Sequence, residues 1–437
     1  MLKNTLLRSK IVYNSIIASV DQAALSALSF FISIVLIKNV AKVEYGYYSI
    51  GFSIALFLIC IQNAIVNTPL AVLLVSKKSD EKKIYAASLG LGQFIVILPA
   101  VCLGFGIAAI SKWGGLDATQ AAVAAAICFA AIGILFREFL RAYFFAEEIP
   151  QQVLKIDLAY VIIFLSGVGI IYFFATISVP LIFVLMGICG ILAGLIFGRR
   201  RNWHFRHLAL KKSYSENWKY GKWALLGVIV WHVQNYSYLY LLGALLGGAA
   251  VAEVSAARLL MMPMILFREG WMKIAVPYGS RLREQRNLNR FFKEQLLICL
   301  IFGLVVVLYT AVIMSLSGFL QTMLFTQKYT DSLSYILFYA VIFIVGFLGV
   351  NANYGLQVTK HFDLITKINF FTMLVTLGCT YFLIKGYGIK GSLTALIIGE
   401  ALVAGILWFN YAKIVFFRLS DQRVPRTKKI MAPRYSK

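Results

Sequence analysis

The sequence has 437 residues, of which 60% are hydrophobic and only 14% are charged, and its mean hydropathy is +0.81. Because soluble domains carry about 25% charged residues, this composition excludes an ordinary water-soluble protein and indicates one that works inside a bilayer. All six cysteines lie in apolar stretches and none forms a CxxC pair, so neither disulfides nor a metal site are indicated.

Long apolar segments with few charges recur along the whole chain, and each is near the roughly 20 residues that a helix needs to cross the hydrocarbon layer. A transmembrane β-barrel would instead need alternating segments of about ten residues, which the sequence lacks. We therefore predict an all-α polytopic membrane protein with about twelve transmembrane helices. Three of them contain a proline that is expected to kink the helix, at Pro69, Pro99 and Pro263. The expected ranges are 11–37, 47–76, 84–111, 119–146, 153–175, 179–198, 223–246, 250–268, 295–320, 334–357, 364–385 and 391–412.

The placement of the basic residues predicts the orientation. With the N-terminus inside, 35 of the 42 Lys and Arg residues fall on the cytoplasmic side, 6 fall on the opposite side and Arg258 lies within a span. This asymmetry favours a multi-pass protein of the cytoplasmic (inner) membrane with both termini inside. The formal net charge of +24 then reflects topology and contact with membrane lipids rather than nucleic-acid binding.

The apolar segments divide into two halves of six. Residues 1–198 form the expected N-terminal lobe, 199–222 a basic cytoplasmic connection, 223–412 the C-terminal lobe and 413–437 an exposed basic tail. A weak internal repeat supports the division, because Leu36–Tyr48 and Leu242–Val254 both join the first two helices of their half. Two repeated halves around a central site are a recurrent plan of transporters.

Several short motifs stand at or near the ends of the predicted helices. They are VEYGYY at Val43–Tyr48, VSAAR at Val254–Arg258 followed by Pro263 and Pro277, LFTQKY at Leu324–Tyr329, and YGIKG at Tyr387–Gly391. On these motifs the chain resembles the polysaccharide-exporter branch of the multidrug/oligosaccharidyl-lipid/polysaccharide (MOP) superfamily, which includes Wzx-type O-antigen flippases. One departure is Thr326, where the family usually has glycine.

The resemblance implies a fold of two lobes around a central cavity that opens alternately to each side of the membrane. It also implies the substrate class, a lipid-linked oligosaccharide on an undecaprenyl diphosphate carrier, for surface polysaccharides such as the O-antigen of lipopolysaccharide or an exopolysaccharide. A polysaccharide polymerase and chain-length machinery are then candidate partners. No cofactor is expected.

Ionisable residues inside the predicted spans are the first functional candidates, because a charge in the bilayer costs about 2.5–3.5 kcal/mol on insertion scales. Arg258 lies near the middle of the helix expected at 250–268, where a cation suits a diphosphate headgroup; the alternative is a structural ion pair with Asp21 or Glu400. Those two carboxylates are themselves candidates for coupling transport to protons or sodium, or else for charge pairing without coupling.

Further polar residues could line the cavity. His232 and Asn235 lie three residues apart on one face of the helix at 223–246, where they could bind sugar hydroxyls or another helix. Asn63, in the helix at 47–76, is a similar candidate. Arg137 and Arg141 could attract a phosphate at the cytoplasmic end of the helix at 119–146, although ordinary anchoring at the inner surface explains them as well.

Three functions remain open on the sequence. A flippase for lipid-linked oligosaccharides is favoured. A cation-coupled multidrug exporter of the same superfamily is supported by Asp21 and opposed by Arg258. A membrane-embedded glycan polymerase or glycosyltransferase is disfavoured, because the sequence shows no large extramembrane loop, nucleophile–base pair or metal-ligand spacing. We therefore expect that the protein is not an enzyme.

Overall fold

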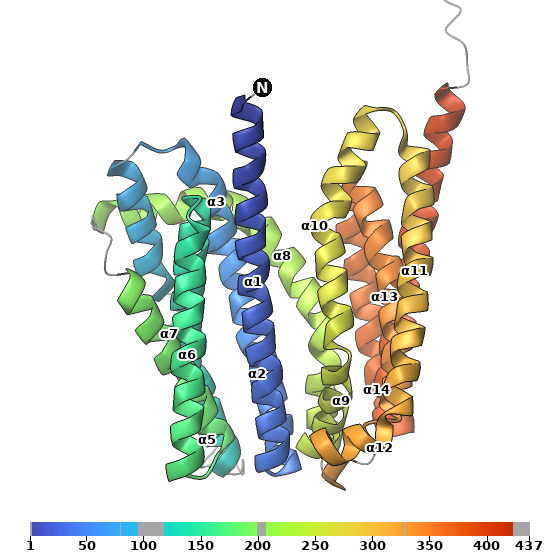
Figure 1. Cartoon of the computed structure of the whole chain (residues 1–437). Coiled ribbons are helices and arrows are strands. Elements are labelled where there is room, and N and C mark those ends of the chain that lie inside the picture. Colours follow the sequence, from blue (N-terminus) through green and yellow to red (C-terminus); the bar gives the residue numbers. More distant parts are fainter. Residues whose placement is uncertain are drawn as a thin grey trace, which may run out of the picture.

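The computed structural model describes residues 2–78, 80–94, 118–198, 207–325, 327–329 and 331–422. Within these ranges every regular element is a helix and there is no strand (Figure 1). The predicted all-α fold is thus confirmed.

The first half of the chain forms one group of helices. They are α1 (Leu2–Asn39), α2 (Lys42–Gln62) with its continuation through η1 (Asn63–Asn67), α3 (Thr68–Leu73) and η2 (Leu74–Ser76), a helix over residues 80–94, α5 (Ala118–Ala146), α6 (Pro150–Phe174) and α7 (Val179–Gly198).

The second half forms the other group. Its elements are α8 (His207–Leu246), α9 (Gly248–Leu260), α10 (Met262–Glu284), α11 (Leu288–Ser315), α12 (Ser317–Leu320), η3 (Gln321–Phe325), η4 (Gln327–Tyr329), α13 (Tyr335–Val358) and α14 (Phe362–Gln422).

Eight helices of the described ranges are long and apolar enough to cross a membrane, and the bent pair α9 and α10 makes a ninth. The long α14 contains two arms, because Gly388 adopts a positive φ of 61° and reverses the chain there. These arms correspond to the helices predicted at 364–385 and 391–412. Each of the other predicted helices also has a counterpart, although the third is described only to residue 94 and Pro99 lies outside the described residues.

Two helices extend well beyond the apolar segments that predicted them. α8 begins at His207 instead of residue 223, and α10 continues to Glu284 instead of ending at residue 268. Both extensions are rich in charged residues, which a hydropathy reading excludes from a span although they continue the helix outside the hydrocarbon. The chain bends by 58° between α9 and α10, next to Pro263, where a kink was expected.

The π-helical turn η1, which ends just before Pro69, is stabilised by α8. Proline has no N–H group, so the Ile65 carbonyl four residues earlier loses its usual helical donor. The Asn217 side-chain amide of α8 donates to Ile65 O at 3.1 Å and to Val66 O at 3.4 Å, and the Tyr85 hydroxyl donates to Asn217 Oδ1. The start of α8 is therefore fixed to the N-terminal half.

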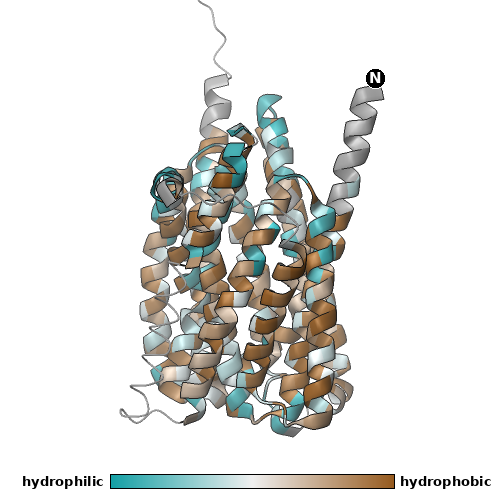
Figure 2. Cartoon of the chain, turned by 90° about the vertical axis from the view of Figure 1, so that its left-hand side faces the viewer, coloured by the Kyte–Doolittle hydropathy of each residue, from teal (hydrophilic) through white to brown (hydrophobic). Residues whose placement is uncertain are grey.

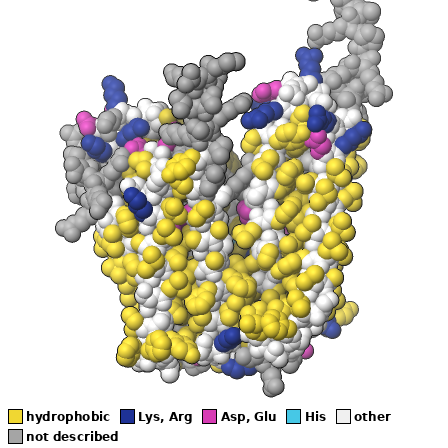
Figure 3. Space-filling view, in the orientation of Figure 1, with side chains coloured by type: hydrophobic (Ala, Val, Ile, Leu, Met, Phe, Trp, Pro, Cys, Tyr) yellow, Lys and Arg dark blue, Asp and Glu magenta, His cyan; other side chains and the backbone are white. Residues whose placement is uncertain are grey.

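The surface of the bundle is apolar where it would face lipid. Large side chains such as Phe173, Phe174 and Leu300 are 80%, 85% and 72% exposed, which is unfavourable in water but expected in hydrocarbon. Hydrophobic residues cover the middle of the bundle, and the charged residues gather toward its ends (Figures 2 and 3). The start of α1 and the end of α14 lie at the same end (Figure 1), as an even number of crossings requires. The chain is a polytopic membrane protein.

Candidate functional site

A cavity of about 250 Å³ lies between the two halves of the chain. Its walls come from α1 and α2 of the first half and from α8, α9 and α10 of the second half. The lining residues are Ser29, Ser33, Tyr45, Tyr48, Ser49, Phe52, Ser53, Leu56, Tyr236, Leu239, Ser255, Arg258, Leu259, Met262 and Ile265.

The chemistry of this wall is hydroxylated, aromatic and positive. Five of the lining residues are serines, and Arg258 is the one charged side chain among the described residues that line it. Tyr45, Tyr48 and Phe52 form a ladder along α2, with ring centroids 6.0 and 5.8 Å apart. The Tyr48 hydroxyl has no hydrogen-bond partner in the described part of the chain, so the cavity has an unused polar group as well as a cation.

Arg258 is held by an aromatic residue. Its Nη2 donates to the Tyr236 hydroxyl at 3.4 Å, and its guanidinium lies 5.1 Å from the centroid of the Tyr236 ring. Among the described residues no carboxylate lies within 4.0 Å of it, and Asp21 pairs with Arg141 instead. The alternative to headgroup binding was that Arg258 forms a structural ion pair with Asp21 or Glu400. Neither ion pair is formed.

His232 lies behind the cavity wall rather than on it. The side chain is only 3% exposed, and its ring stacks on Tyr236 and Phe57 with centroid distances of 4.7 and 4.3 Å. Its Nε2 contacts the Tyr240 hydroxyl at 2.9 Å. The Tyr240 hydroxyl also accepts a hydrogen bond from the Ser53 hydroxyl at 2.9 Å. His232 thus supports Tyr236, which in turn contacts Arg258.

The two asparagine candidates do not line the cavity. The Asn235 amide donates to the Trp231 carbonyl of its own helix at 2.8 Å. Asn63 is exposed in the π-helical turn η1, where it accepts a hydrogen bond from Asn67 at 2.7 Å. Both bonds are local to their helices.

Arg137, Arg141 and Asp21 meet in a buried ionic network inside the first half. Arg141 donates from Nη2 to Asp21 at 3.0 Å, and its Nε lies 2.6 Å from a carboxylate oxygen of Asp157 in an ion pair. It also contacts Glu138 at 2.7 Å. Arg137 contacts Glu138 at 2.9 Å and lies 3.7 Å from Asp157. The network joins α1, α5 and α6 and does not reach the lining of the interlobe cavity.

The network carries three carboxylates against two guanidinium groups. Asp21 and Asp157 are each 1% exposed, and both contact Arg141. Asp157 was not predicted as a functional residue from the sequence. A lone carboxylate within the apolar 153–175 segment is nevertheless the same signal that pointed to Asp21.

A second polar contact closes one end of the boundary between the halves. We call it the outer-end interface, formed by Lys42 and Gly46 of α2, Gly248 and Glu253 of α9, and Ser332. Glu253 pairs with Lys42 and accepts a hydrogen bond from Ser332. The backbones are so close that a Cβ on Gly46 would lie 1.9 Å from the Gly248 carbonyl oxygen.

The halves are in contact at this end and are separated by a groove toward the other end (Figure 3). The charge distribution predicts that the closed end faces outward, because it contains the short connection after α1. With this predicted orientation, the cavity would be closed on the outer side.

Glu400 belongs to α14, and its side chain lies away from the cavity and faces α13. Its Oε2 is 3.2 Å from where a Cβ would stand on Gly346 of α13. No cation of the described residues lies within 4.0 Å of it, so Glu400 has no close ion pair there.

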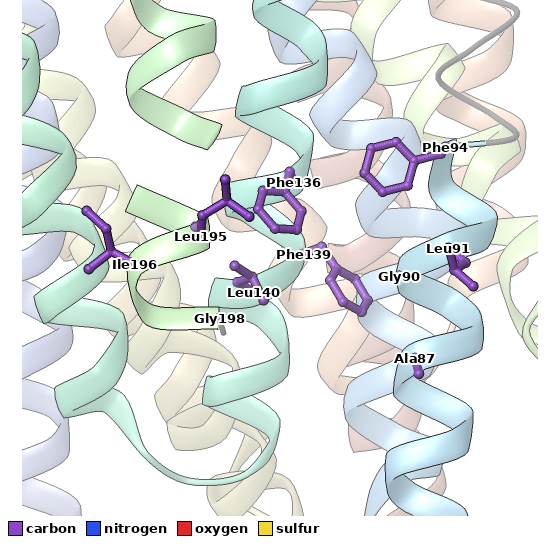
Figure 4. Close-up of a pocket in the computed structure, with 11 residues that line it drawn as sticks. Ala87, Gly90, Leu91, Phe94, Phe136, Phe139, Leu140, Leu195, Ile196 and Gly198 are labelled. Atoms are coloured by element: carbon purple, nitrogen blue, oxygen red, sulfur yellow. The ribbon is translucent and has the colours of Figure 1, made fainter. Parts of the chain in front are cut away.

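A larger cavity, of about 730 Å³, lies within the first half. Phenylalanines and aliphatic residues of the 80–94 helix, α5 and α7 line it, including Phe94, Phe136 and Phe139 (Figure 4). None of its described lining residues is charged or carries a hydroxyl group, so none of them would recognise a headgroup. Nor do the described residues contain a cluster of three or more His, Cys, Asp or Glu that could hold a metal.

Comparisons with known proteins agree with this architecture. An inward-facing multidrug resistance MATE family transporter of the MOP superfamily aligns with a TM-score of 0.75 and 12% identity, over 91% of this chain and 96% of the other. The lipid II flippase MurJ in an inward closed conformation aligns with a TM-score of 0.71 and 13% identity, over 96% and 94%.

A third structure is a MOP superfamily transporter from Pyrococcus furiosus, with a TM-score of 0.59 and 12% identity over 93% and 95% of the two chains, in which the reverse polarity of the binding pocket suggests a different function. No family model and no curated protein matches the sequence. The chain has the fold of the MOP superfamily transporters.

Proposed function

We propose that this protein is a flippase that translocates oligosaccharide repeat units linked to undecaprenyl diphosphate across the cytoplasmic membrane, for the synthesis of a surface polysaccharide. The observation that carries the proposal is the position of Arg258, a cation in the interlobe cavity with no carboxylate partner among the described residues. A buried cation is costly unless an anion meets it, and a diphosphate headgroup supplies that anion.

The rest of the wall fits the remainder of such a substrate. Serine hydroxyls and the free Tyr48 hydroxyl can hydrogen-bond to sugars, and the ladder of Tyr45, Tyr48 and Phe52 offers aromatic faces to a sugar ring. The lipid tail would stay in the membrane at the boundary between the halves.

The volume of the cavity implies movement. About 250 Å³ is below the roughly 300–1,000 Å³ of ordinary small-molecule sites, so the closed cavity holds the diphosphate and a first sugar at most. A longer oligosaccharide requires the halves to separate, and release to the outside requires the outer-end interface to open. This is alternating access, with the substrate headgroup on Arg258 as the halves move.

A multidrug exporter is the second candidate, favoured by the structural similarity to a MATE family transporter and by the buried carboxylates of the ionic network. Its usual cationic substrates would meet Arg258 as a like charge in a confined, partly dry site. This repulsion makes the drug-export function the weaker of the two. An enzymatic function is not proposed.

The test is transport by the purified protein in liposomes, with a fluorescent lipid-linked oligosaccharide in one assay and ethidium in the other. Arg258→Ala should lower oligosaccharide translocation by at least tenfold, because a hydrogen bond to a charged group is worth about 1.5–3 kcal/mol. Arg258→Lys should retain part of the activity, since charge remains although the bidentate geometry is lost.

Arg281→Ala is the matched control, because Arg281 is exposed at the end of α10. Normal oligosaccharide transport by Arg258→Ala would exclude Arg258 as the headgroup contact. Ethidium transport by the wild type without oligosaccharide transport would favour the drug exporter.

A further inference from the structure

The first part of α8 is an amphipathic helix with one side fixed to the protein. Ser213, Asn217 and Gly221 are buried and follow each other at intervals of four residues, so they form one stripe along the helix. Asn217 donates to the π-helical turn η1 that follows α2, and the Tyr214 hydroxyl donates to Leu89 O at 3.2 Å.

The opposite side of this helix is exposed and basic. Lys211, Lys212, Lys219 and Lys222 are all exposed, and at 3.6 residues per turn they occupy the middle of the outer face. Among the described residues none of them has a carboxylate within 4.0 Å. Glu216, the one acidic residue of residues 207–223, pairs with Lys77 of the first half at 2.9 Å, so the exposed lysines are not neutralised by it.

Aromatic residues flank the lysines. Trp218, Tyr220 and Trp223 are 50%, 59% and 71% exposed, which is a large apolar area to leave in water. Trp and Tyr rings combine an apolar body with a polar edge and concentrate at the level of the lipid headgroups. Lysines beside such rings indicate that this face of the helix binds a membrane surface that carries negative charge.

The place of the helix in the fold agrees with a membrane surface. This part of α8 runs across the bundle near the end where α1 begins and α14 ends (Figures 1 and 2), and the charge distribution predicts that end to be cytoplasmic. Beyond Trp223 the same helix enters the apolar part of the bundle, so Trp223 lies at the boundary.

We propose that the outer face of α8, formed by Lys211, Lys212, Trp218, Lys219, Tyr220, Lys222 and Trp223, binds the headgroups of anionic phospholipids of the cytoplasmic leaflet. The lysines contact the phosphates and the aromatic rings lie among the glycerol groups. This site is separate from the interlobe cavity and does not depend on which substrate that cavity takes.

The test measures quenching of tryptophan fluorescence in nanodiscs of phosphatidylcholine and phosphatidylglycerol at 7:3. The overall composition stays constant, and only the lipid that carries brominated acyl chains changes. Subtracting the emission of the Trp218→Phe/Trp223→Phe variant isolates the two tryptophans. Per mole of brominated lipid, phosphatidylglycerol should quench this emission about threefold more than phosphatidylcholine, and 0.5 M salt should reduce the preference.

Changing Lys211, Lys212, Lys219 and Lys222 together to Gln should abolish the preference. The matched control replaces Arg281, Arg286, Lys360 and Lys367 by Gln, which removes the same charge from exposed positions outside α8 and should leave the preference intact. If the quadruple variant does not fold, the pairs Lys211→Gln/Lys222→Gln and Lys212→Gln/Lys219→Gln should each lower it.

Equal quenching by the two lipids, or a preference that survives in the lysine variants, would overturn the proposal. Absence of quenching by either lipid would also overturn it, because the face would then be covered by protein or exposed to water.

Discussion

Replacing Glu253 by Gln should weaken the outer-end interface without changing its shape. The Glu253 side chain is 4% exposed and pairs with Lys42, which is 29% exposed. A buried charge-assisted hydrogen bond is worth about 1.5–3 kcal/mol, and the partial exposure of Lys42 favours the lower figure. Since about 1.4 kcal/mol is a factor of ten, the equilibrium should shift about tenfold toward the state that is open to the outside.

The assay is labelling from outside by a membrane-impermeant maleimide. A single cysteine at Ser49, on the cavity wall, reports opening in a chain from which the six native cysteines have been removed. Glu253→Gln should raise the labelling rate about tenfold, and Lys42→Met should raise it similarly. The double variant should add little, because both changes break the same contact.

Lys38→Met serves as the control, since Lys38 is exposed at the end of α1, and it should leave the labelling rate unchanged. The reasoning is refuted if Glu253→Gln labels at the wild-type rate. It is also refuted if the effects of Glu253→Gln and Lys42→Met are fully additive, because independent effects would mean that the pair does not hold the outer end closed.

Three more outcomes are expected. Gly46→Ala should increase labelling of the same cysteine at least as much as Glu253→Gln, because a Cβ would lie 1.9 Å from the Gly248 carbonyl oxygen. Unchanged labelling would show that α2 and α9 can move apart at this contact without opening the cavity. Arg141→Met should lower the free energy of unfolding by about 3–5 kcal/mol, seen as a lower midpoint of thermal unfolding in detergent, and an unchanged midpoint would contradict the stabilising role of the network. Asp21→Asn or Glu400→Gln, which mimic the protonated acids, should remove gradient-driven transport in proteoliposomes in at least one case; if both variants respond fully to proton and sodium gradients, these carboxylates are structural.

The sequence was sufficient to predict the helices, because the cost of placing polar groups in hydrocarbon leaves a direct pattern in the chain. It also singled out Arg258, since a lone cation in the middle of an apolar segment is visible without a structure. The extents of α8 and α10 were not predictable from hydropathy, because both helices continue through charged residues, which a hydropathy reading excludes from a span.

The partners of the charged residues could not be predicted, because they depend on which helices are neighbours. Asp21 and Arg141 are 120 residues apart, and only the packing of α1, α5 and α6 brings them together. Lys42 and Glu253, separated by 211 residues, lie near helix ends, where charges are ordinary. Nothing in either local sequence indicates that they close a boundary between the halves.

The ionic network has a consequence for how the chain enters the membrane. Asp21 is synthesised 120 residues before Arg141, so at about 5–20 residues per second α1 leaves the ribosome roughly 6–24 s before its arginine partner. During this interval α1 carries a lone carboxylate, which costs about 2.5–3.5 kcal/mol at the centre of a helix. α1 therefore has to remain beside the translocation machinery or near the water interface until α5 arrives, and the N-terminal half can complete its assembly only after the fourth predicted span has been made.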